Sequence, residues 1–172
     1  IDMGFIVLPT DFGDFSGFGA ATQTVNSAIR IGTLATDSEL TNPSNNTATG
    51  DNASGTNDED LTMPAFTIGT ATTLSVPVTI TPASLSGGAA RINVFVDWNG
   101  DGDVTDFSET QTVQSVVSSG TRSFSLTPPA TTAAGMKFLR IRLTEGTTAP
   151  TFTGVSGFKG EVEDYAISVN CP

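Results

Sequence analysis

Short runs in which apolar and polar residues alternate occupy most of the chain after residue 72. In residues 73–81, for example, Leu74, Val76, Val78 and Ile80 alternate with small or polar residues. A period of two places every second side chain on the same face of a strand, so these runs predict half-buried β-strands. The predicted strands cover residues 73–81, 91–98, 111–117, 122–127, 137–144 and 162–169, and shorter apolar runs at 3–9 and 28–32 predict two more.

Three details of the pattern predict how these strands are arranged. Pro77 lies inside the run 73–81, and because proline has no N–H to donate, it predicts an edge strand or a bulge. A Ser-Ser-Gly-Thr turn at 118–121 predicts that the strands on either side of it form a hairpin. In residues 137–144 the alternation directs leucine and isoleucine inward and Arg140 and Arg142 outward.

Seven or eight short strands separated by glycine and proline turns, without an amphipathic helix of useful length, predict the fold class. We expect an all-β protein, an antiparallel β-sandwich of Ig-like or jelly-roll-like form. Residues 34–61 contain almost nothing apolar and would be disordered alone. So long a structureless segment is unusual in a compact domain. We therefore expect a metal ion to organise this acidic N-terminal loop region.

Charge and composition exclude several classes of function. The net charge is −11, the sequence pI is about 4.1, and the seven Lys and Arg residues are scattered, so nucleic acid is not an expected partner. The absence of histidine removes the commonest general base and the usual zinc ligand. No apolar window is long enough to cross a bilayer, so we expect no membrane insertion.

The segment 97–109 carries the most specific chemical pattern in the chain. Oxygen-bearing side chains occupy alternate positions 1, 3, 5 and 7 of a loop: Asp97, Asn99, Asp101 and Asp103. This is the first half of an EF-hand-like calcium loop, in which such oxygens converge on a hard cation. Position 12 is Ser108 rather than an acid, so Glu109 or Asp106 would complete the coordination. The alternative is a solvated acidic turn.

A second group of acids lies near the C-terminus, in the sequence GEVEDY. Because adjacent strand residues face opposite ways, Glu161 and Glu163 share a face and Asp164 points away. A carboxylate directed inward is costly unless a cation neutralises it, either Arg140 or Arg142 or a metal. Our hypothesis is that the acidic first third folds back over this strand and that calcium bridges some of these carboxylates: Asp58, Glu59, Asp60, Glu161 and Glu163. Pairing with arginine alone is the alternative.

Taken together, these motifs resemble the GEVED domain family of bacterial secreted and cell-surface proteins. The matching stretches, in order, are DFGD, RIGTLATDSE, GDNASGTNDED, VFVDWNGDGDVTD, LRIRLTEG and GEVEDYAISV, and they span most of residues 11–169. The resemblance implies an extracellular β-sandwich module of large adhesin-like proteins or a companion of secreted enzymes. Typical members have DDEDG where this chain has NDEDL, which implies that one ligand is missing there.

The resemblance also implies a division of the chain. Residues 1–10 are expected to be a strand or linker from a preceding module or an assembly strand, 11–170 a single GEVED-like domain, and 171–172 the start of a linker. The chain begins with Ile1 and no signal peptide is visible, so we expect a processed chain or a segment of a longer protein. Cys171, the single cysteine, either has a partner in another chain or domain or is a free thiol.

The leading functional prediction is a non-catalytic, calcium-binding structural or adhesive module located outside the cell. Its expected partners are calcium ions, other modules or copies of the same protein, and a surface glycan or protein receptor. One alternative is a filament or surface-layer subunit in which residues 5–8 add as a strand to a neighbour's sheet edge. A carbohydrate-binding module, and a glycosidase with two carboxylates, are further alternatives that the crowding of the acids does not favour.

Overall fold

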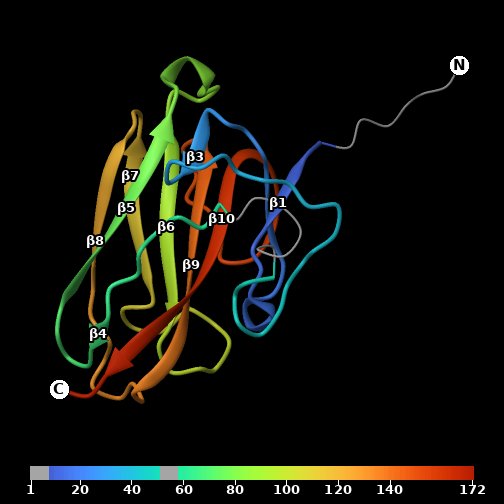
Figure 1. The fold of residues 1–172 in the computed structure, drawn as a ribbon. Coiled ribbons are helices and arrows are strands. Elements are labelled where there is room, and N and C mark those ends of the chain that lie inside the picture. Colours follow the sequence, from blue (N-terminus) through green and yellow to red (C-terminus); the bar gives the residue numbers. More distant parts are fainter. Residues whose placement is uncertain (1–7, 51–57) are drawn as a thin grey trace, which may run out of the picture.

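Two β-sheets form the framework of the protein in a computed structural model that describes residues 8–50 and 58–172 (Figure 1). In spatial order the large sheet contains β1 (Thr10–Phe12), β2 (Ala21–Thr24), β10 (Gly154–Asn170), β9 (Gly135–Glu145), β6 (Ala90–Asp97) and β7 (Thr110–Val116), with β4 (Phe66–Thr67) also paired to β10. The small sheet contains β3 (Ile29–Ile31), β5 (Thr72–Ile80) and β8 (Gly120–Leu126). The described helices are two single 3-10 turns, η1 (Ser16–Phe18) and η3 (Pro82–Ser84). The predicted all-β sandwich is therefore confirmed.

The apolar core lies between the two sheets, as the alternation predicts. Leu74 and Phe124 of the small sheet and Leu139 and Ile141 of β9 are almost completely inaccessible to solvent, and Trp98 is buried beside them. Burial of each such side chain contributes about 1.5–3 kcal/mol to the free energy of folding. The core therefore stabilises β4 to β10, and almost none of it comes from residues 32–50.

The large sheet is not purely antiparallel, and one predicted connection is wrong. Both β2 and β4 run parallel to β10. The strands β7 and β8 do not form a hairpin, because β7 pairs with β6 in one sheet and β8 pairs with β5 in the other. The turn at 117–119 carries the chain across the sandwich. Apolar side chains that face the core from either sheet produce the same alternation, so the pattern cannot separate a hairpin from a crossing.

Pro77 also differs from its prediction, because β5 is the middle strand of the small sheet and its register has no bulge. The Pro77 carbonyl accepts the Gly32 N–H at 2.8 Å, just beyond the last residue of β3. In a strand the nitrogen and the carbonyl of one residue point to the same side. The Pro77 nitrogen therefore faces the place where β3 has ended, so the missing N–H costs the sheet no ladder hydrogen bond.

The outer face of the large sheet is covered by the first third of the chain, which lies beside β10 (Figure 1). Arg140 points to this face and is fully buried there, with its Nε and Nη2 atoms each 2.7 Å from an Asp164 oxygen. The rings of Phe18 and Phe152 lie 5.4 Å from its guanidinium carbon. A Cβ on Gly13 would lie 2.5 Å from Arg140 Nη2, so only glycine fits at that position.

Arg142 is likewise buried on the outer face, and it forms no salt bridge in the part of the chain that the structure describes. Its guanidinium donates instead to main-chain carbonyls, those of Thr22 and Thr151 at 2.8 Å and that of Gly154 at 2.9 Å. Both arginines point away from the apolar core, as the alternation predicts. Neither reaches solvent, because the first third and residues 151–154 cover them.

We predict that Asp164→Asn lowers the free energy of unfolding by about 3–5 kcal/mol, because it leaves the Arg140 charge buried without a counter-charge. Urea unfolding of metal-stripped protein measures this. Lys159→Gln is the control: Lys159 lies 3.8 Å from Glu145 and its side chain is 34% exposed, so we expect a loss of about 1 kcal/mol or less. Equal losses in the two variants would contradict the importance of the Arg140–Asp164 pair.

Candidate metal centres

The first candidate centre is the loop between Asp97, the last residue of β6, and Thr110, the first residue of β7. These strands are antiparallel neighbours, so the loop closes a hairpin. The Val96 N–H donates to the Glu109 carbonyl at 2.8 Å and closes the base of the loop. The loop therefore projects from one end of the large sheet on a rigid base.

The first half of the loop folds around the Asp97 carboxylate. Oδ1 of Asp97 accepts the Gly100 N–H at 2.6 Å, and Oδ2 accepts the Gly102 N–H at 2.9 Å. Both glycines have φ near +90°, a conformation that other residues seldom adopt. The Asp101 N–H in turn donates to Asn99 Oδ1 at 2.9 Å. The alternate acidic and amide residues thus bend the backbone into a tight arc, as their spacing predicts.

Two carboxylates of this loop converge on one point. The side-chain nitrogen of Asn99 lies 2.8 Å from Asp101 Oδ2 and 2.7 Å from Asp106 Oδ2, so the amide hydrogens reduce the repulsion between the two acids. Rotation of the Asn99 amide would bring its oxygen to the same place and would give up the hydrogen bond from the Asp101 N–H. A hard cation at that point would then have three oxygen ligands from three different residues.

Two other predicted ligands of the loop, Glu109 and Asp103, accept hydrogen bonds from its backbone N–H groups. Glu109 is buried, and its carboxylate accepts the Trp98 N–H at 3.1 Å and the Asp106 N–H at 3.0 Å. Burial raises the pKa of Glu109, and the charges of Asp106 and Asp97 add to that effect, whereas the two N–H groups oppose it. Asp103 is exposed and accepts two hydrogen bonds from Thr105, which lower its pKa.

The second candidate centre is a group of carboxylates where the first third meets β3 and β10. We call it the carboxylate seam, and it consists of Asp11, Asp37, Glu39, Asp58, Glu161 and Glu163. Three of its members, Asp11, Asp37 and Glu39, each place one carboxylate oxygen within 4.8 Å of the other two. Within residues 8–50 and 58–172 this is the one such set of three. The seam is therefore the densest concentration of negative charge among the described residues.

Main-chain hydrogen bonds hold the seam together across distant parts of the sequence. Four N–H groups donate to it: Val162 to Asp11 (2.5 Å), Phe12 to Glu39 (3.1 Å), Asp37 to Asp58 (3.0 Å) and Ile31 to Glu161. The Tyr165 hydroxyl donates to Glu163. The Asp11 carboxylate thus attaches β1 to β10, that of Glu161 joins β10 to β3, and those of Glu39 and Asp58 join the segments around residues 12, 37 and 58 to one another.

Burial makes the seam electrostatically costly. Burial, with a smaller contribution from the nearby Asp58 carboxylate, raises the pKa of Glu161 to about 8, although hydrogen bonds from Thr36 and the Ile31 N–H act in the opposite direction. The pKa values of Asp11 and Glu163 are also well above the usual range, first because of burial and then because of the charge of Glu161.

Two guanidinium groups lie at the margin of the seam. Arg30 lowers the pKa of Glu161, and burial and the Arg140 charge lower the pKa of Arg142 to about 10, an effect that the Asp11 carboxylate opposes. Neither arginine forms a salt bridge with the seam in the described part of the chain. The seam therefore carries more negative than positive charge when all its carboxylates are ionised.

The structure agrees with only part of the predicted ligand set. Glu161 and Glu163 do share a face, and Asp58 lies near them. Of the two alternatives for neutralising the GEVEDY carboxylates, pairing with arginine is found for Asp164, which faces the other way and pairs with Arg140. Asp60 lies at another turn, where its Oδ2 accepts the Thr33 N–H at 2.8 Å and the Leu34 N–H at 3.3 Å.

The convergence of Asp11, Asp37 and Glu39 was not predicted. Their only signal in the sequence is the acidic character of DFGD and TDSE, and neither spacing indicates that they meet.

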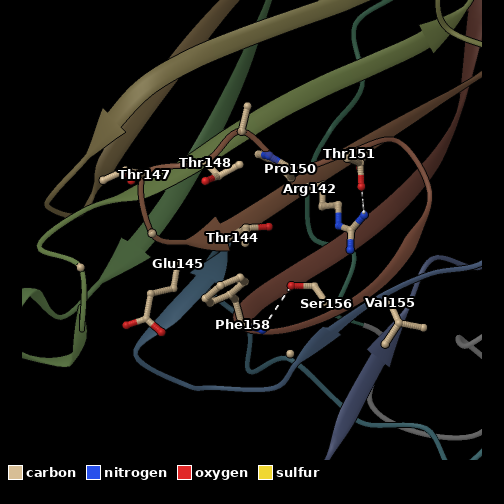
Figure 2. A pocket seen from close by; sticks show the side chains of 14 residues that line it. Arg142, Thr144, Glu145, Thr147, Thr148, Pro150, Thr151, Val155, Ser156 and Phe158 are labelled. Carbon is tan, nitrogen blue, oxygen red and sulfur yellow. Dashed lines mark hydrogen bonds between the residues drawn. The ribbon is translucent and has the colours of Figure 1, made fainter.

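A hollow of about 400 Å³ lies between the residues after β9 and the start of β10. Figure 2 shows its walls, with Arg142 bonded to Thr151 and with Phe158 and Val155 among the side chains around it. Glu145 is the one carboxylate of the residues that line it, and it accepts the Ser86 N–H. A glycoside hydrolase needs two carboxylates across its cleft, and this hollow lacks the second.

Comparison with known families identifies the second half of the chain. Residues 91–168, somewhat less than half of the sequence, match the GEVED domain family. This part of the chain is a GEVED domain. The match runs from β6 to β10 and includes the loop 97–109 together with Glu161 and Glu163 of the seam. No curated protein and no solved structure is significantly similar to the chain.

The structure gives each residue of the GEVED motif a physical role. A Cβ on Gly160 would lie 1.9 Å from the Leu143 carbonyl oxygen, so glycine permits the close approach of β10 to β9. Glu161 and Glu163 face the seam, and Val162 supplies the N–H that Asp11 accepts. Asp164 faces the opposite side and neutralises Arg140. The motif thus combines one steric requirement with carboxylates on both faces of the strand.

We predict that the metal-stripped protein becomes less stable as the pH rises from about 4.5 to 8. The pKa of Glu161 rises from 4.5 in the unfolded chain to about 8 in the folded one, so between these values the folded state binds more protons. The stabilisation that protonation of Glu161 contributes is complete below pH 4.5 and is lost as the pH approaches 8. Each unit of difference between the folded and unfolded pKa values corresponds to about 1.4 kcal/mol in the free energy of unfolding. Urea unfolding at pH 5 and pH 8 after metal removal on a chelating resin tests this.

The matched control is Glu161→Gln, which should show a weaker pH dependence than the parent over the same range. Greater stability at pH 8 than at pH 5 in the metal-stripped parent would contradict the prediction.

Proposed function

We propose that the protein is a non-catalytic, extracellular calcium-binding module with a structural or adhesive role in a bacterial surface or secreted protein. The observation that carries the proposal is the convergence of Asp101 and Asp106 on the Asn99 amide, in a loop whose backbone is already folded around Asp97. A cation at that point would meet oxygens at the spacing that calcium loops use.

Calcium is the ion that these ligands favour. The loop offers carboxylate and amide oxygens, and the chain has no histidine and a single cysteine, which is exposed at residue 171. Oxygen-only sites suit calcium, magnesium and manganese, whereas zinc and copper prefer nitrogen or sulfur ligands. Magnesium demands a small octahedral site, and an exposed loop of adjustable carboxylates accommodates the larger ion more readily.

A structural role fits better than a catalytic one. The loop carboxylates are crowded at alternate positions around one point, which suits an ion and not an acid and a base placed on either side of a substrate. The hollow between β9 and β10 holds a single carboxylate. Calcium that binds only the folded state would stabilise the loop and the strands that carry it.

An extracellular location follows from the proposed ion. Modules of this kind bind calcium at roughly 10⁻⁴–10⁻³ M, concentrations found outside cells. No helix among the described residues is long and apolar enough to cross a membrane. Other modules, copies of the same protein, and a surface glycan or receptor protein remain the proposed partners. The strand-addition alternative depends on residues 5–8, of which 5–7 lie outside the described part of the chain.

We predict that 1 mM calcium raises the thermal midpoint of the metal-stripped protein and that Asp101→Ala removes much of the loop's share of this increase. A weak site contributes on the order of 1 kcal/mol at this concentration, or about 2–4 °C for a chain of this size. Thermal unfolding with calcium and with EDTA measures the effect. The variant's midpoint in EDTA should match that of the parent, and an equal calcium shift in both proteins would refute the assignment of this loop.

A further inference from the structure

We propose that Asp11, Asp37 and Glu39, with the Glu163 carboxylate facing them from β10, form a buried calcium site that joins the first third of the chain to the GEVED domain. This site is separate from the loop 97–109, and it rests on the proposed function only in the choice of calcium as the ion.

Geometry supplies the first support. Oxygens of Asp11, Asp37 and Glu39 all lie within 4.8 Å of one another, as they would around a common cation at calcium–oxygen distances of about 2.3–2.6 Å. These residues come from β1 and from the segment after β3, and they are 26 and 2 positions apart in sequence. Nothing in local turn geometry brings them together. The Glu39 N–H donates to the Thr10 carbonyl at 2.9 Å, which fixes the two segments side by side.

An oxygen of Glu163 without a partner is the second, independent observation. Glu163 is only 2% exposed; its Oε2 accepts the Tyr165 hydroxyl, and its Oε1 accepts no hydrogen bond from any described residue. It lies on the same face of β10 as Glu161, whose carboxylate accepts the Ile31 N–H of β3, and the Asp11 carboxylate is close enough for its charge to raise the pKa of Glu163. A buried carboxylate oxygen without a donor is costly, and a metal ion would satisfy it. Asp37 Oδ1 is also inaccessible to solvent and has no partner among the described residues.

The balance of charge leads to the same conclusion. The seam contains six carboxylates, whereas the arginines at its margin, Arg30 and Arg142, bond to main-chain carbonyls instead. A divalent ion would neutralise two charges at the place where they are most crowded. The calcium ion takes six to eight oxygen ligands, mixing carboxylates and water, which a site of three converging carboxylates and a fourth nearby can provide.

The proposed site lies apart from the loop 97–109. In the strand register Asp97 stands opposite Phe138, and Glu163 stands opposite Ile141, three residues further along β9. That displacement is about 10 Å along the strand, in addition to two strand spacings of about 4.8 Å each. One ion cannot contact both groups, so variants in one centre leave the ligands of the other in place.

The test uses metal-stripped full-length chain and calcium as the probe. Equilibrium dialysis against calcium should detect two classes of site in the parent, the buried one binding at least tenfold more tightly than the loop. Asp11→Asn and Glu163→Gln preserve side-chain shape and should each weaken the tight class at least tenfold. Asp101→Ala should affect only the weak class. Glu145→Gln, a change at a buried carboxylate outside the seam, should leave both classes unchanged.

Stability measurements distinguish a loss of calcium binding from a folding defect in the variants. Each seam variant removes a buried negative charge, so its thermal midpoint in EDTA should equal or exceed that of the parent, while most of the calcium-induced increase disappears. A purely structural role for these acids predicts the opposite, namely a lower midpoint in EDTA and an unchanged calcium shift.

Hydrogen exchange of the Phe12 and Asp37 amides, which donate to seam carboxylates, should slow on calcium binding in the parent alone.

The outcomes distinguish this site from the proposed loop. Parent-like binding in both Asp11→Asn and Glu163→Gln overturns the buried site, and the loop proposal still stands if Asp101→Ala loses the weak class. Loss of the tight class in the seam variants with no effect of Asp101→Ala supports the buried site and refutes the loop. A parent that binds no calcium at millimolar concentration overturns both.

Discussion

The rest of the structure depends on how the carboxylates on the two faces of β10 are neutralised. On the outer face Asp164 has a buried guanidinium, that of Arg140, held by two hydrogen bonds and by the rings of Phe18 and Phe152. On the face toward β3, Glu161 and Glu163 have only N–H and O–H donors. Charge buried in a medium of low dielectric constant must be compensated locally. The carboxylates on the two faces of β10 are therefore compensated in two different ways by the surrounding chain.

This constraint explains how the first third is positioned without a core of its own. Its segments carry donors and acceptors to the edge of β10: Phe15 donates to Asp164 at 2.8 Å, and the Asp11 carboxylate accepts the N–H of Val162. Few apolar side chains accompany these contacts between residues 32 and 50. The sandwich itself is stabilised by apolar burial, which salt and metal ions hardly change. Phe18, Ile29 and Ile31 of the first third share in this apolar burial. Residues 32–50 are attached mainly by polar and charged contacts, so their stability depends on ionic conditions and pH.

The sequence permits prediction of those features that arise within a few residues. Alternation in 73–81 and 137–144 gives the strands β5 and β9, and the spacing of Asp97, Asn99 and Asp101 gives the arc of the loop. Features that depend on distant partners were not predictable. Whether β8 pairs with β7 or β5 leaves its alternation unchanged, and Pro77 is tolerated in a central strand only because β3 ends beside it. Asp11 meets Val162 across 151 positions, which no spacing rule describes.

The boundary of the family match adds a last physical point. The matched region, 91–168, contains Glu161 and Glu163 but none of Asp11, Asp37, Glu39 and Asp58, which lie nearest to them in the seam. A strand with two buried carboxylates on one face cannot be a complete structural unit, because apart from the Tyr165 hydroxyl the strand does not supply the donors or the cation that their charge requires. The GEVED motif of this chain is therefore one half of an electrostatic arrangement, and the acidic residues that precede the match are its other half. Their low hydrophobicity is not a sign of a dispensable linker, since carboxylates and main-chain donors are what this interface uses.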